Sequence, residues 1–499
     1  MAKVESFAQS AARAFKAIDD ELRKPGSGCG SALQYMEQSS WLLFLRYLDA
    51  AEAGRQAEAE LCGERYEPVL PEALAWHTWA YPQTAAGRLD VGRLLTGPEL
   101  IDFVQRDLFP GLRRLRDEAA VDSLAYRVGA IFSELTCTFT DGYLLREVIE
   151  KVQPLVFSTE AEQHELSVLY EERLQAMGNA GRDGGQYYTP RALIRVMVRV
   201  LAPKLGETIY DGACGSGGFL CEAFTYLRER TRNAGAQAYD LLQHRTFSGC
   251  EVKALPYITA QMNCILHGLT APNIEKVDTL SKRIADFTDR DRVDIILANP
   301  PFGAATSTNV QANFTLRTTE TALLFLEHFV AKLRRGGRAA IIIKNTFLSN
   351  TDAASIAMRR RLLERCRLDW VLDLPQKVFV NAGVRTIVLF FTKGEPTTQP
   401  IRYYQFTPPE GVALGKKRPL RESDLAEFER LASAGPNAPL PDSPNAWTLD
   451  PATLDPQTLD LSVRNPHLQA ETLPPAADCL ARLRALHAEL DALLKDLAQ

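Results

Sequence analysis

Ile209-Tyr210-Asp211-Gly212-Ala213-Cys214-Gly215-Ser216-Gly217-Gly218-Phe219 follows a short β-rich run and leads into a segment with helical spacing. A turn of this kind lies at the carboxyl end of a strand, where open α/β sheets bind ligands. Glycines lack a Cβ atom, so the backbone can turn tightly and approach a ligand closely. The spacing is neither G-x-G-x-x-G nor that of a phosphate-binding P-loop, because no lysine follows. The stretch therefore predicts an α/β domain with a ligand site at this turn.

Short β-rich runs alternate with helical segments around this turn. The expected strands are 208–211, 246–250, 274–277, 293–298, 338–343, 368–374 and 386–392. The expected helices include 219–230, 255–267 and 321–333, with Gly336-Gly337 ending the last of them. This alternation predicts an α/β domain with a largely parallel sheet.

The two flanking regions have a different character. Apolar residues recur at three- and four-residue spacing in 11–22, 33–48, 98–109 and 121–132, which indicates helices and a role in binding or assembly. Beyond about residue 395 the chain is rich in Pro, Asp and Ser, and Pro436 to Pro456 is expected to be a meandering surface segment. A leucine-patterned helix, 476–497, is either a packed terminal helix or a partner-binding helix. We predict three parts: 1–175, 176–400 and 401–499.

Length and composition exclude several classes of protein. A chain of 499 residues is expected to form two or three domains. It has no run of eighteen apolar residues and no apolar region behind its first residues, so we expect neither a membrane span nor a secretory signal. Nine scattered cysteines without a C-x-x-C pair argue against a disulfide framework or a zinc site. We expect reduced thiols, no metal and a cytoplasmic location.

The formal net charge of -5 does not indicate a nucleic-acid binder, although clustered charge matters more than the total. One basic stretch, 191–204, has Arg195 and Arg199 at helical spacing, and another runs from Lys332 to Arg361. Each is either a solvated helix face or part of a phosphate-binding surface. If DNA is the substrate, an acidic chain can rely on a partner for much of the phosphate contact.

Two carboxylates lie at the ends of neighbouring expected strands. Asp211 suits a cationic group, such as the ammonium of a methionine moiety. Glu251 ends the next strand, where a carboxylate can accept two hydrogen bonds from ribose hydroxyls, although it lies about twice as far downstream as in the dinucleotide fingerprint. The alternative is a structural glycine-rich loop with an unrelated surface glutamate.

Asn299-Pro300-Pro301-Phe302 follows the buried run 293–298. Two prolines cannot continue a central strand, because they lack N–H donors and fix φ. They form a rigid corner at which the Asn299 side-chain oxygen and the Pro300 carbonyl can accept both hydrogens of an aromatic amine. That arrangement leaves the lone pair of the amine nitrogen free to attack, and Phe302 can stack on the base. The alternative is a plain proline-rich turn.

These motifs, in this order, resemble amino-group DNA methyltransferases, specifically the modification (M) subunits of type I restriction-modification systems. The similarity extends from about residue 5 to 465 and includes Leu266-His267-Gly268. It implies a Rossmann-like sheet of seven strands, the last of which form a hairpin, preceded by an all-helical N-terminal domain. One difference is local: many M subunits follow the fifth strand with a proline and an acidic residue, whereas this chain has Lys344-Asn345-Thr346-Phe347.

The resemblance assigns roles to individual residues. Asn299, Pro300, Pro301 and Phe302 are the expected catalytic residues. Residues expected to line S-adenosylmethionine are Gln186, Tyr187, Tyr188, Thr189, Pro190, Arg191, Asp211, Gly212, Cys214, Gly215, Ser216, Gly217, Gly218, Glu251 and Asp278. Glu251 is expected to take the ribose and Asp278 to lie near the cofactor's adenine, while Cys214 itself has the character of a small packing residue.

The implied reaction is direct transfer of a methyl group to the N6 amine of adenine in double-stranded DNA, in which the protein mainly positions the two reactants. The base must flip out of the helix, because N6 is inaccessible to this geometry in a stacked duplex. Expected partners are a separate specificity (S) subunit and a second copy of this chain, in an assembly of two M subunits with one S subunit, with or without a restriction (R) subunit. The alternatives are an enzyme acting on adenine in RNA or glutamine in a protein, and a binding subunit that has lost activity.

Overall fold

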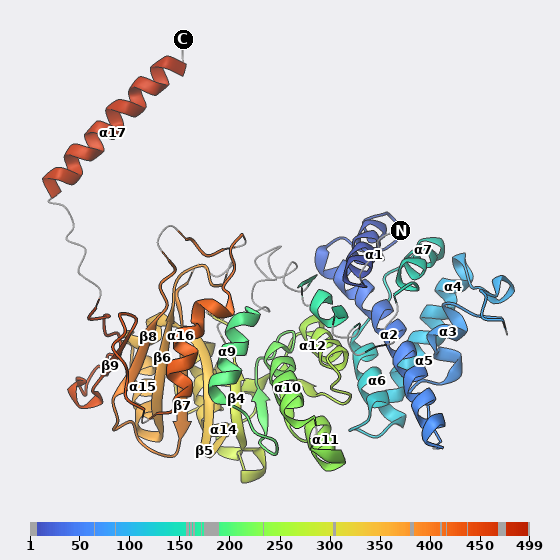
Figure 1. Cartoon of the computed structure of the whole chain (residues 1–499), viewed down its shortest axis with the longest axis horizontal. Coiled ribbons are helices and arrows are strands. Elements are labelled where there is room, and N and C mark those ends of the chain that lie inside the picture. Colours follow the sequence, from blue (N-terminus) through green and yellow to red (C-terminus); the bar gives the residue numbers. More distant parts are fainter. Residues whose placement is uncertain are drawn as a thin grey trace.

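The computed structural model describes residues 7–63, 65–84, 86–155, 159, 162, 165–170, 172–173, 189–232, 234–302, 306–379, 384–409, 412–415, 417–436, 438–467 and 476–497. A group of N-terminal helices occupies one end of an elongated molecule, and a domain built on a single sheet occupies the other (Figure 1). Among the described residues, no helix is long and apolar enough to cross a membrane.

The described part of the sheet has nine strands in the order β3-β2-β1-β4-β5-β7-β6-β8-β9. Their bounds are β1 Ile209–Asp211, β2 Phe247–Glu251, β3 Asn273–Lys276, β4 Val293–Ala298, β5 Leu333–Lys344, β6 Cys366–Leu374, β7 Thr386–Lys393, β8 Ile401–Gln405 and β9 Ala446–Leu449. β7 runs antiparallel to both β5 and β6, and β9 runs antiparallel to β8, while the other pairs are parallel. The seven expected strands, including the final hairpin, are confirmed.

Two expectations were wrong. The segment 436–456 is not a surface meander throughout, since Ala446–Leu449 forms β9 and buries Ala446 and Trp447 against the sheet. Gly336-Gly337 does not end a helix either: α14 ends at Lys332, and both glycines lie inside β5. There Leu333 pairs with Val293, and the register shifts before Ile295 pairs with Arg338, so the glycines accommodate an irregularity in the strand.

Helices cover both faces of the sheet (Figure 1). One face carries α9 (Arg191–Leu201), α10 (Gly218–Thr231), α11 (Gly235–His244), α12 (Ala254–Leu266) and α16 (Ala426–Ser433), and the other carries α14 (Thr321–Lys332) and α15 (Ala353–Arg365). A short helix, α13 (Thr308–Gln311), lies between β4 and α14 in sequence. Along β4, Ile295 and Leu297 pack into one core cluster, whereas Ile296 and Ala298 pack into the other. Burial on both faces explains why this strand is apolar at every position except Asp294.

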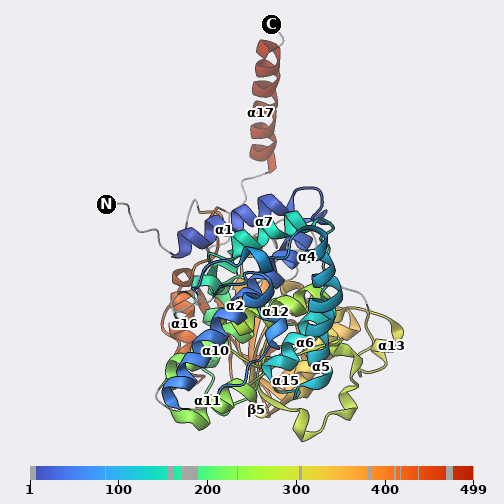
Figure 2. The same ribbon diagram turned by 90° about the vertical axis from the view of Figure 1, so that its right-hand side faces the viewer.

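The N-terminal region is helical, as expected, and lies beside α10 and α12 (Figure 2). Its helices are α1 (Phe7–Leu22), α2 (Ala32–Cys62), α3 (Trp76–Trp79), α4 (Gly97–Phe103), α5 (Phe109–Glu118), α6 (Leu124–Glu134) and α7 (Gly142–Val152). The Tyr47 hydroxyl on α2 donates to the Ile265 carbonyl on α12 at 3.3 Å. Lys276 at the end of β3 pairs with Glu134 on α6 at 2.5 Å. These contacts join the helical region to the sheet domain.

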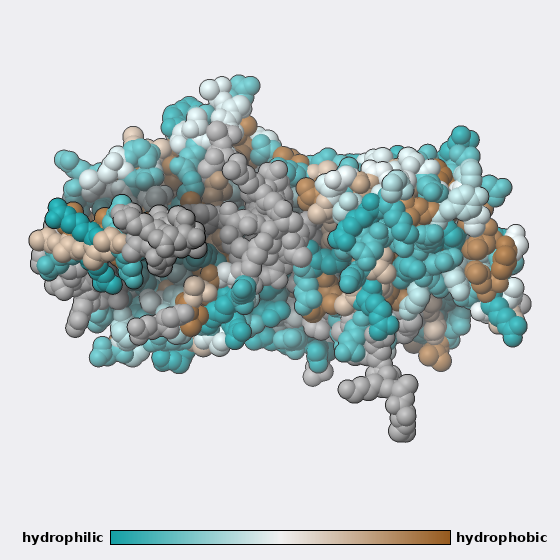
Figure 3. Space-filling model, turned by 90° about the horizontal axis from the view of Figure 1, so that it is seen from above, coloured by the Kyte–Doolittle hydropathy of each residue, from teal (hydrophilic) through white to brown (hydrophobic). Residues whose placement is uncertain are grey.

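The terminal helix α17 (Ala476–Leu497) projects away from the rest of the molecule (Figure 1). Residues 477–490 are all exposed, including Leu480, Leu483, Leu486 and Leu490. Seen from above in Figure 3, the described surface is mainly hydrophilic, with separate brown patches. The expectation of a terminal helix packed on its own chain is therefore not met by the described residues of α17.

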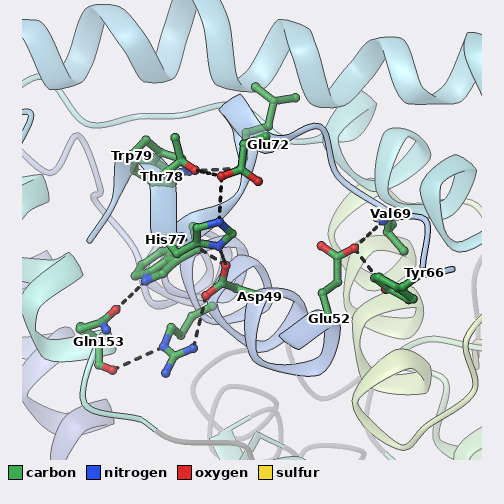
Figure 4. Close-up of polar contacts among 12 residues, drawn as sticks. Asp49, Glu52, Tyr66, Val69, Glu72, His77, Thr78, Trp79 and Gln153 are labelled. Carbon is green, nitrogen blue, oxygen red and sulfur yellow. Dashed lines mark hydrogen bonds and ion pairs between the residues drawn. The ribbon is translucent and has the colours of Figure 1, made fainter. Parts of the chain in front are cut away.

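An ion-pair network lies on the surface of the N-terminal region, where the side chains of His77, Asp49 and Glu72 converge (Figure 4). His77 Nδ1 is 2.6 Å from Asp49 on α2, and its Nε2 is 3.1 Å from Glu72. The hydrogen bond to Asp49, opposed by partial burial and supported by Glu72, raises the pKa of His77 to about 9. The charged imidazolium thus ties α3 to α2 at neutral pH.

This network predicts a pH-dependent stability. Because the folded pKa of His77 is above its ordinary value of 6.5, its stabilising contribution is complete below about pH 6.5 and is lost as the pH rises through about 9. The difference in melting temperature between wild type and His77→Gln should shrink over that window. Asp49→Asn should reproduce the loss by removing the main partner. Thermal melts with parallel pH profiles for wild type and His77→Gln would contradict the assignment.

Candidate active site

The carboxyl ends of β1 and β4 lie side by side, because these strands pair in parallel with Ile209 opposite Ile295. β1 ends at Asp211, and Asn299 directly follows β4. β2 lies on the other side of β1, so the chain order reverses here, which is where open α/β sheets bind ligands. A cavity of about 20 Å³ at this point is lined by Asp211, Asn299, Thr189 and residues of the glycine-rich turn.

The glycine-rich turn needs its glycines at two positions in particular. Gly215 (φ 52°) and Gly217 (φ 78°) adopt the left-handed conformation that favours glycine. α10 begins directly afterwards, at Gly218. The remaining residues of the turn are held from outside: Cys214 N–H donates to the Cys250 carbonyl at 3.1 Å, and the Ser216 carbonyl accepts from Asn263 Nδ2 at 3.0 Å. The turn is therefore a fixed cradle at the end of β1.

Asp211 lies at the floor of this cradle and is fully buried. Its Oδ1 accepts the N–H of Ala213 at 3.0 Å, whereas its Oδ2 is buried and has no hydrogen-bond partner among the described residues. Burial, and to a smaller degree the charge of Glu251, raises the pKa of Asp211 to about 8. A buried carboxyl with one unused oxygen is a receptor for a cationic group.

Glu251 at the end of β2 is buried and ties the turn to its neighbouring strand. Its Oε2 accepts the N–H of Gly215 at 3.0 Å, and its Oε1 accepts the N–H of Lys253 at 2.9 Å. Each carboxylate oxygen can accept more than one hydrogen bond, so both remain usable by a diol. Asp278 follows β3, and its Oδ1 accepts the N–H of Leu280 at 3.0 Å.

Cys214 is buried in the turn. Burial, together with the nearby Asp211 carboxyl, raises the pKa of its thiol well above the ordinary value. The thiolate form, which is the nucleophilic one, is therefore disfavoured.

The Asn299 side chain is held in one orientation. Its Nδ2 donates to Thr189 Oγ1 at 3.0 Å, while its Oδ1 is buried and accepts no hydrogen bond from the described residues. Pro300 is buried behind it. Thr189, expected among the cofactor residues, thus contacts Asn299 directly. Leaving a buried acceptor unused is costly, and such an acceptor is ready for an external donor.

Phe302 is half-buried and meets Phe379 edge-to-face, with ring centroids 6.2 Å apart and planes at 87°. Phe379 is buried and lies in the connection between β6 and β7. No local spacing in the sequence indicates Phe379, because its contact with Phe302 joins segments far apart in the chain. Edge-to-face packing fixes the orientation of the Phe302 ring.

Other expected site residues have mixed outcomes. Gln186, Tyr187 and Tyr188 lie outside the described residues. Pro190 is the N-cap residue of α9, and Arg191 is its first residue, lining the same small cavity as Asp211.

The basic stretches are largely engaged inside the protein. On α9, Arg195 pairs with Glu222 and Glu422, and Arg199 pairs with Glu422 and Glu429. In the second stretch, Arg359 is buried and donates to the carbonyls of Phe347, Asn350 and Thr458. Arg338 pairs with Glu207, and Arg361 with Glu327. For these residues the arrangement favours structural ion pairs over a phosphate-binding surface.

The fold and the paired strand ends define a Rossmann-like methyltransferase acting on an amino group. Comparisons with known proteins agree. A family model described as N-6 DNA Methylase matches residues 161–435, and one described as HsdM N-terminal domain matches residues 11–152. A type I restriction enzyme EcoEI methylase subunit from Escherichia coli is 33% identical over 490 residues, covering 97% of this chain and 96% of the relative.

Solved structures show the same likeness. A modification subunit assigned to a type I restriction enzyme from Vibrio vulnificus YJ016 has a TM-score of 0.82 and 32% identity, covering 92% of this chain and 97% of that one. A structure from work on complex assembly and conformational transition of the type I R-M system has a TM-score of 0.77 and 30% identity, covering 99% and 98%. The chain belongs to the family of type I restriction enzyme methylase subunits. It is an adenine-specific DNA methyltransferase of the modification-subunit kind.

Proposed function

We propose that Asn299 and Pro300 hold the N6 amine of an adenine flipped out of duplex DNA, beside a methyl donor held by Asp211, the glycine-rich turn and Glu251. One observation supports this assignment most directly: two buried, unpartnered side-chain oxygens, Asn299 Oδ1 and Asp211 Oδ2, lie at adjacent strand ends and line one cavity within the part of the chain that the structure describes. One suits an amine N–H and the other suits a cation.

S-adenosylmethionine fits the residues of this site and, when bound, supplies the methyl group on its sulfonium. Asp211 would pair with the ammonium, Glu251 would accept the ribose hydroxyls, and Asp278 would lie near the adenine. The left-handed glycines bring the backbone of the turn close to the ligand.

The raised pKa of Asp211 predicts that cofactor affinity depends on pH. Its pKa is about 8 in the free protein, and pairing with an ammonium requires the carboxylate, so binding releases a proton below that pH. Affinity should therefore rise as the pH approaches about 8, and it should fall again at higher pH, where the ammonium of the ligand loses its proton. Asp211→Asn keeps the acceptor for Ala213 but should weaken binding by about 2 kcal/mol and remove the rise. Calorimetry from about pH 6 to about pH 9 measures both, and a wild-type affinity that is flat in pH would refute the pairing.

The corner residues position the amine. The hydrogen bond from Asn299 Nδ2 to Thr189 Oγ1 fixes the orientation of the amide. In this orientation Oδ1 has no hydrogen-bond donor among the described residues. Accepting both amine hydrogens at Asn299 Oδ1 and the Pro300 carbonyl holds the nitrogen near tetrahedral geometry, with its lone pair directed out. No proton needs to be removed from the amine before methyl transfer, so the protein's contribution is orientation.

Phe302 should stack on the flipped base. Phe302→Ala is expected to weaken the hold on the base by about 1–3 kcal/mol, whereas Phe302→Tyr and Phe302→Trp keep a π-face and much of the activity. The check is kcat/KM for DNA methylation, with cofactor affinity as the control that should stay constant. A kinetically silent Phe302→Ala would remove Phe302 from the base site.

The exposed leucines of α17 and the helical N-terminal region suit protein contacts. We propose that the chain works with a separate specificity subunit and a second copy of itself, in an assembly of two modification subunits with one specificity subunit, with or without a restriction subunit. The ranges 1–175, 176–400 and 401–499 then serve contacts, catalysis and assembly, with the third range also contributing β8 and β9 to the sheet.

The same corner could hold the planar NH2 group of adenine in RNA or of glutamine in a protein, so these two serve as comparison substrates. The test offers labelled methyl donor to duplex DNA, RNA and protein in parallel, each with and without a co-purified partner. Label is expected in duplex DNA and in neither RNA nor protein. Label in RNA or protein, with DNA blank, would select one of the comparison substrates, and a blank in all three would indicate a binding subunit without activity.

A further inference from the structure

We propose that a second cleft on the carboxyl edge of the sheet, here called the strand-edge cleft, binds a backbone phosphate of the DNA strand that carries the target adenine. The inference rests on the proposed function, since it takes the adenine to be held at Asn299. The cleft has a volume of about 630 Å³. Its polar lining includes Asn345, Thr346, Asp373, Arg385, Gln405 and Arg464.

The position of the cleft suits a nucleotide near the flipped base. Asn345 directly follows β5, which pairs with β4, so the cleft begins one strand away from Asn299. It then spans the ends of β6 and β8 and the start of β7. Since neighbouring strands lie about 4.8 Å apart, the cleft lies roughly 5–20 Å from the catalytic corner along the sheet edge. One strand of DNA advances about 3.4 Å per nucleotide, so a phosphate within a few nucleotides of the target reaches it.

Two arginines supply the charge. Arg385 makes a two-pronged ion pair with Asp373, at 2.9 Å and 2.5 Å, which fixes its guanidinium at the wall of the cleft. Arg464 is exposed and makes no hydrogen bond or ion pair with any residue that the structure describes. Asp373 neutralises Arg385, so Arg464 gives the cleft its net positive charge. An unpaired, planar fork of N–H donors matches a phosphate.

The rest of the cleft is lined mainly by uncharged residues. Asn345 and Thr346 line the cleft where it adjoins the end of β5. Both side chains are neutral and carry hydrogen-bond donors, so this part of the lining does not repel a phosphate. Trp447 forms a buried wall, stacked on Tyr403 with centroids 5.5 Å apart. Its indole N–H has no acceptor among the described residues. The cleft is thus rich in donors and rigidly walled.

The experiment compares Arg464→Ala, Arg464→Lys and wild type in the methylase assembled with its partners. Arg335→Ala is the matched control, because Arg335 is also exposed but lies near the start of β5, at the opposite edge of the sheet. Duplex affinity is measured over a range of salt concentrations, and methylation is measured at saturating DNA. Arg464→Ala should bind duplex about tenfold more weakly, with its salt slope reduced by about 0.9, the value for one phosphate contact.

Arg464→Lys should restore the salt slope, because it keeps the charge, and Arg335→Ala should behave as wild type. Cofactor affinity and the methylation rate at saturating DNA should be unchanged in all variants. Unaltered duplex affinity and salt slope in Arg464→Ala would overturn the proposal. A loss of partner assembly in Arg464→Ala would also overturn it, since the cleft would then take an acidic peptide. If wild type methylates no DNA, the proposed function fails first, which separates the two failures.

Discussion

Asn299→Ala is expected to reduce methyl transfer to near background, with a loss of about 10²–10³-fold, comparable to removing a group that acts on the transition state of an enzyme reaction. The amine would lose one of its two acceptors and would no longer be held with its lone pair exposed. Because Asn299 contacts Thr189 through Nδ2 and its partnerless Oδ1 is proposed to accept from the adenine amine, cofactor affinity should stay nearly constant.

Thr189→Val serves as the graded companion of this variant. It keeps Asn299 but removes the hydroxyl that accepts from its Nδ2, so the amide can rotate. We expect a smaller loss than for Asn299→Ala, of about tenfold, the worth of one hydrogen bond. Single-turnover transfer measures the activity, and calorimetry measures cofactor binding. If Asn299→Ala loses cofactor affinity in proportion to activity, Asn299 belongs to the cofactor site and the proposed role is wrong.

The second large effect concerns partners: purified alone, this chain should not methylate a specific DNA site. Reading a sequence requires side chains placed against base edges in the major groove. The described residues between 189 and 449 form the sheet, its covering helices and their connections, and they do not form a further domain that could read bases. Arg195, Arg199 and Arg359 make ion pairs or hydrogen bonds within the protein. What remains exposed at the carboxyl end is α17 with its leucines, which suits a protein partner.

The measurement is site-specific methylation of duplex DNA by the chain alone and by the chain with a co-purified specificity subunit. We expect rates near background for the chain alone and a gain of at least about 10³-fold with the partner, the usual range of specific over non-specific binding. A version ending before α17 should lose the gain if that helix is the contact. Efficient site-specific methylation by the chain alone would contradict the prediction that it needs a specificity subunit.

The strands nearest the site were the easiest to predict from the sequence. β4 was expected at 293–298 and occupies those residues, because burial on both faces leaves a run that is apolar except for Asp294 and ends at two prolines. β1 was found because it leads directly into the glycine-rich turn, and Asp211 and Glu251 end their strands as expected. β8 and β9 were missed, because β9 is four residues long and lies inside a proline-rich stretch whose composition favours turns.

Contacts between distant segments were beyond sequence reasoning. The Thr189–Asn299 hydrogen bond, the Phe302–Phe379 pair and the ion pairs of Arg195 join segments that only the folded chain brings together. The unused oxygens of Asn299 and Asp211 are also properties of packing, since a sequence gives the residue type but not which of its atoms lack a partner among the described residues. The motifs therefore predicted the chemistry, while the structure supplied the orientation.

The most direct test of the central claim is to identify the atom that is methylated. The assembled methylase is incubated with duplex DNA and labelled methyl donor, the DNA is digested to nucleosides, and the products are separated by mass spectrometry. The wild-type protein should place all label on N6 of adenine, and Asn299→Ala should place almost none. Label on cytosine, or label on N6 that persists in Asn299→Ala, would contradict the proposal that this corner holds the adenine amine.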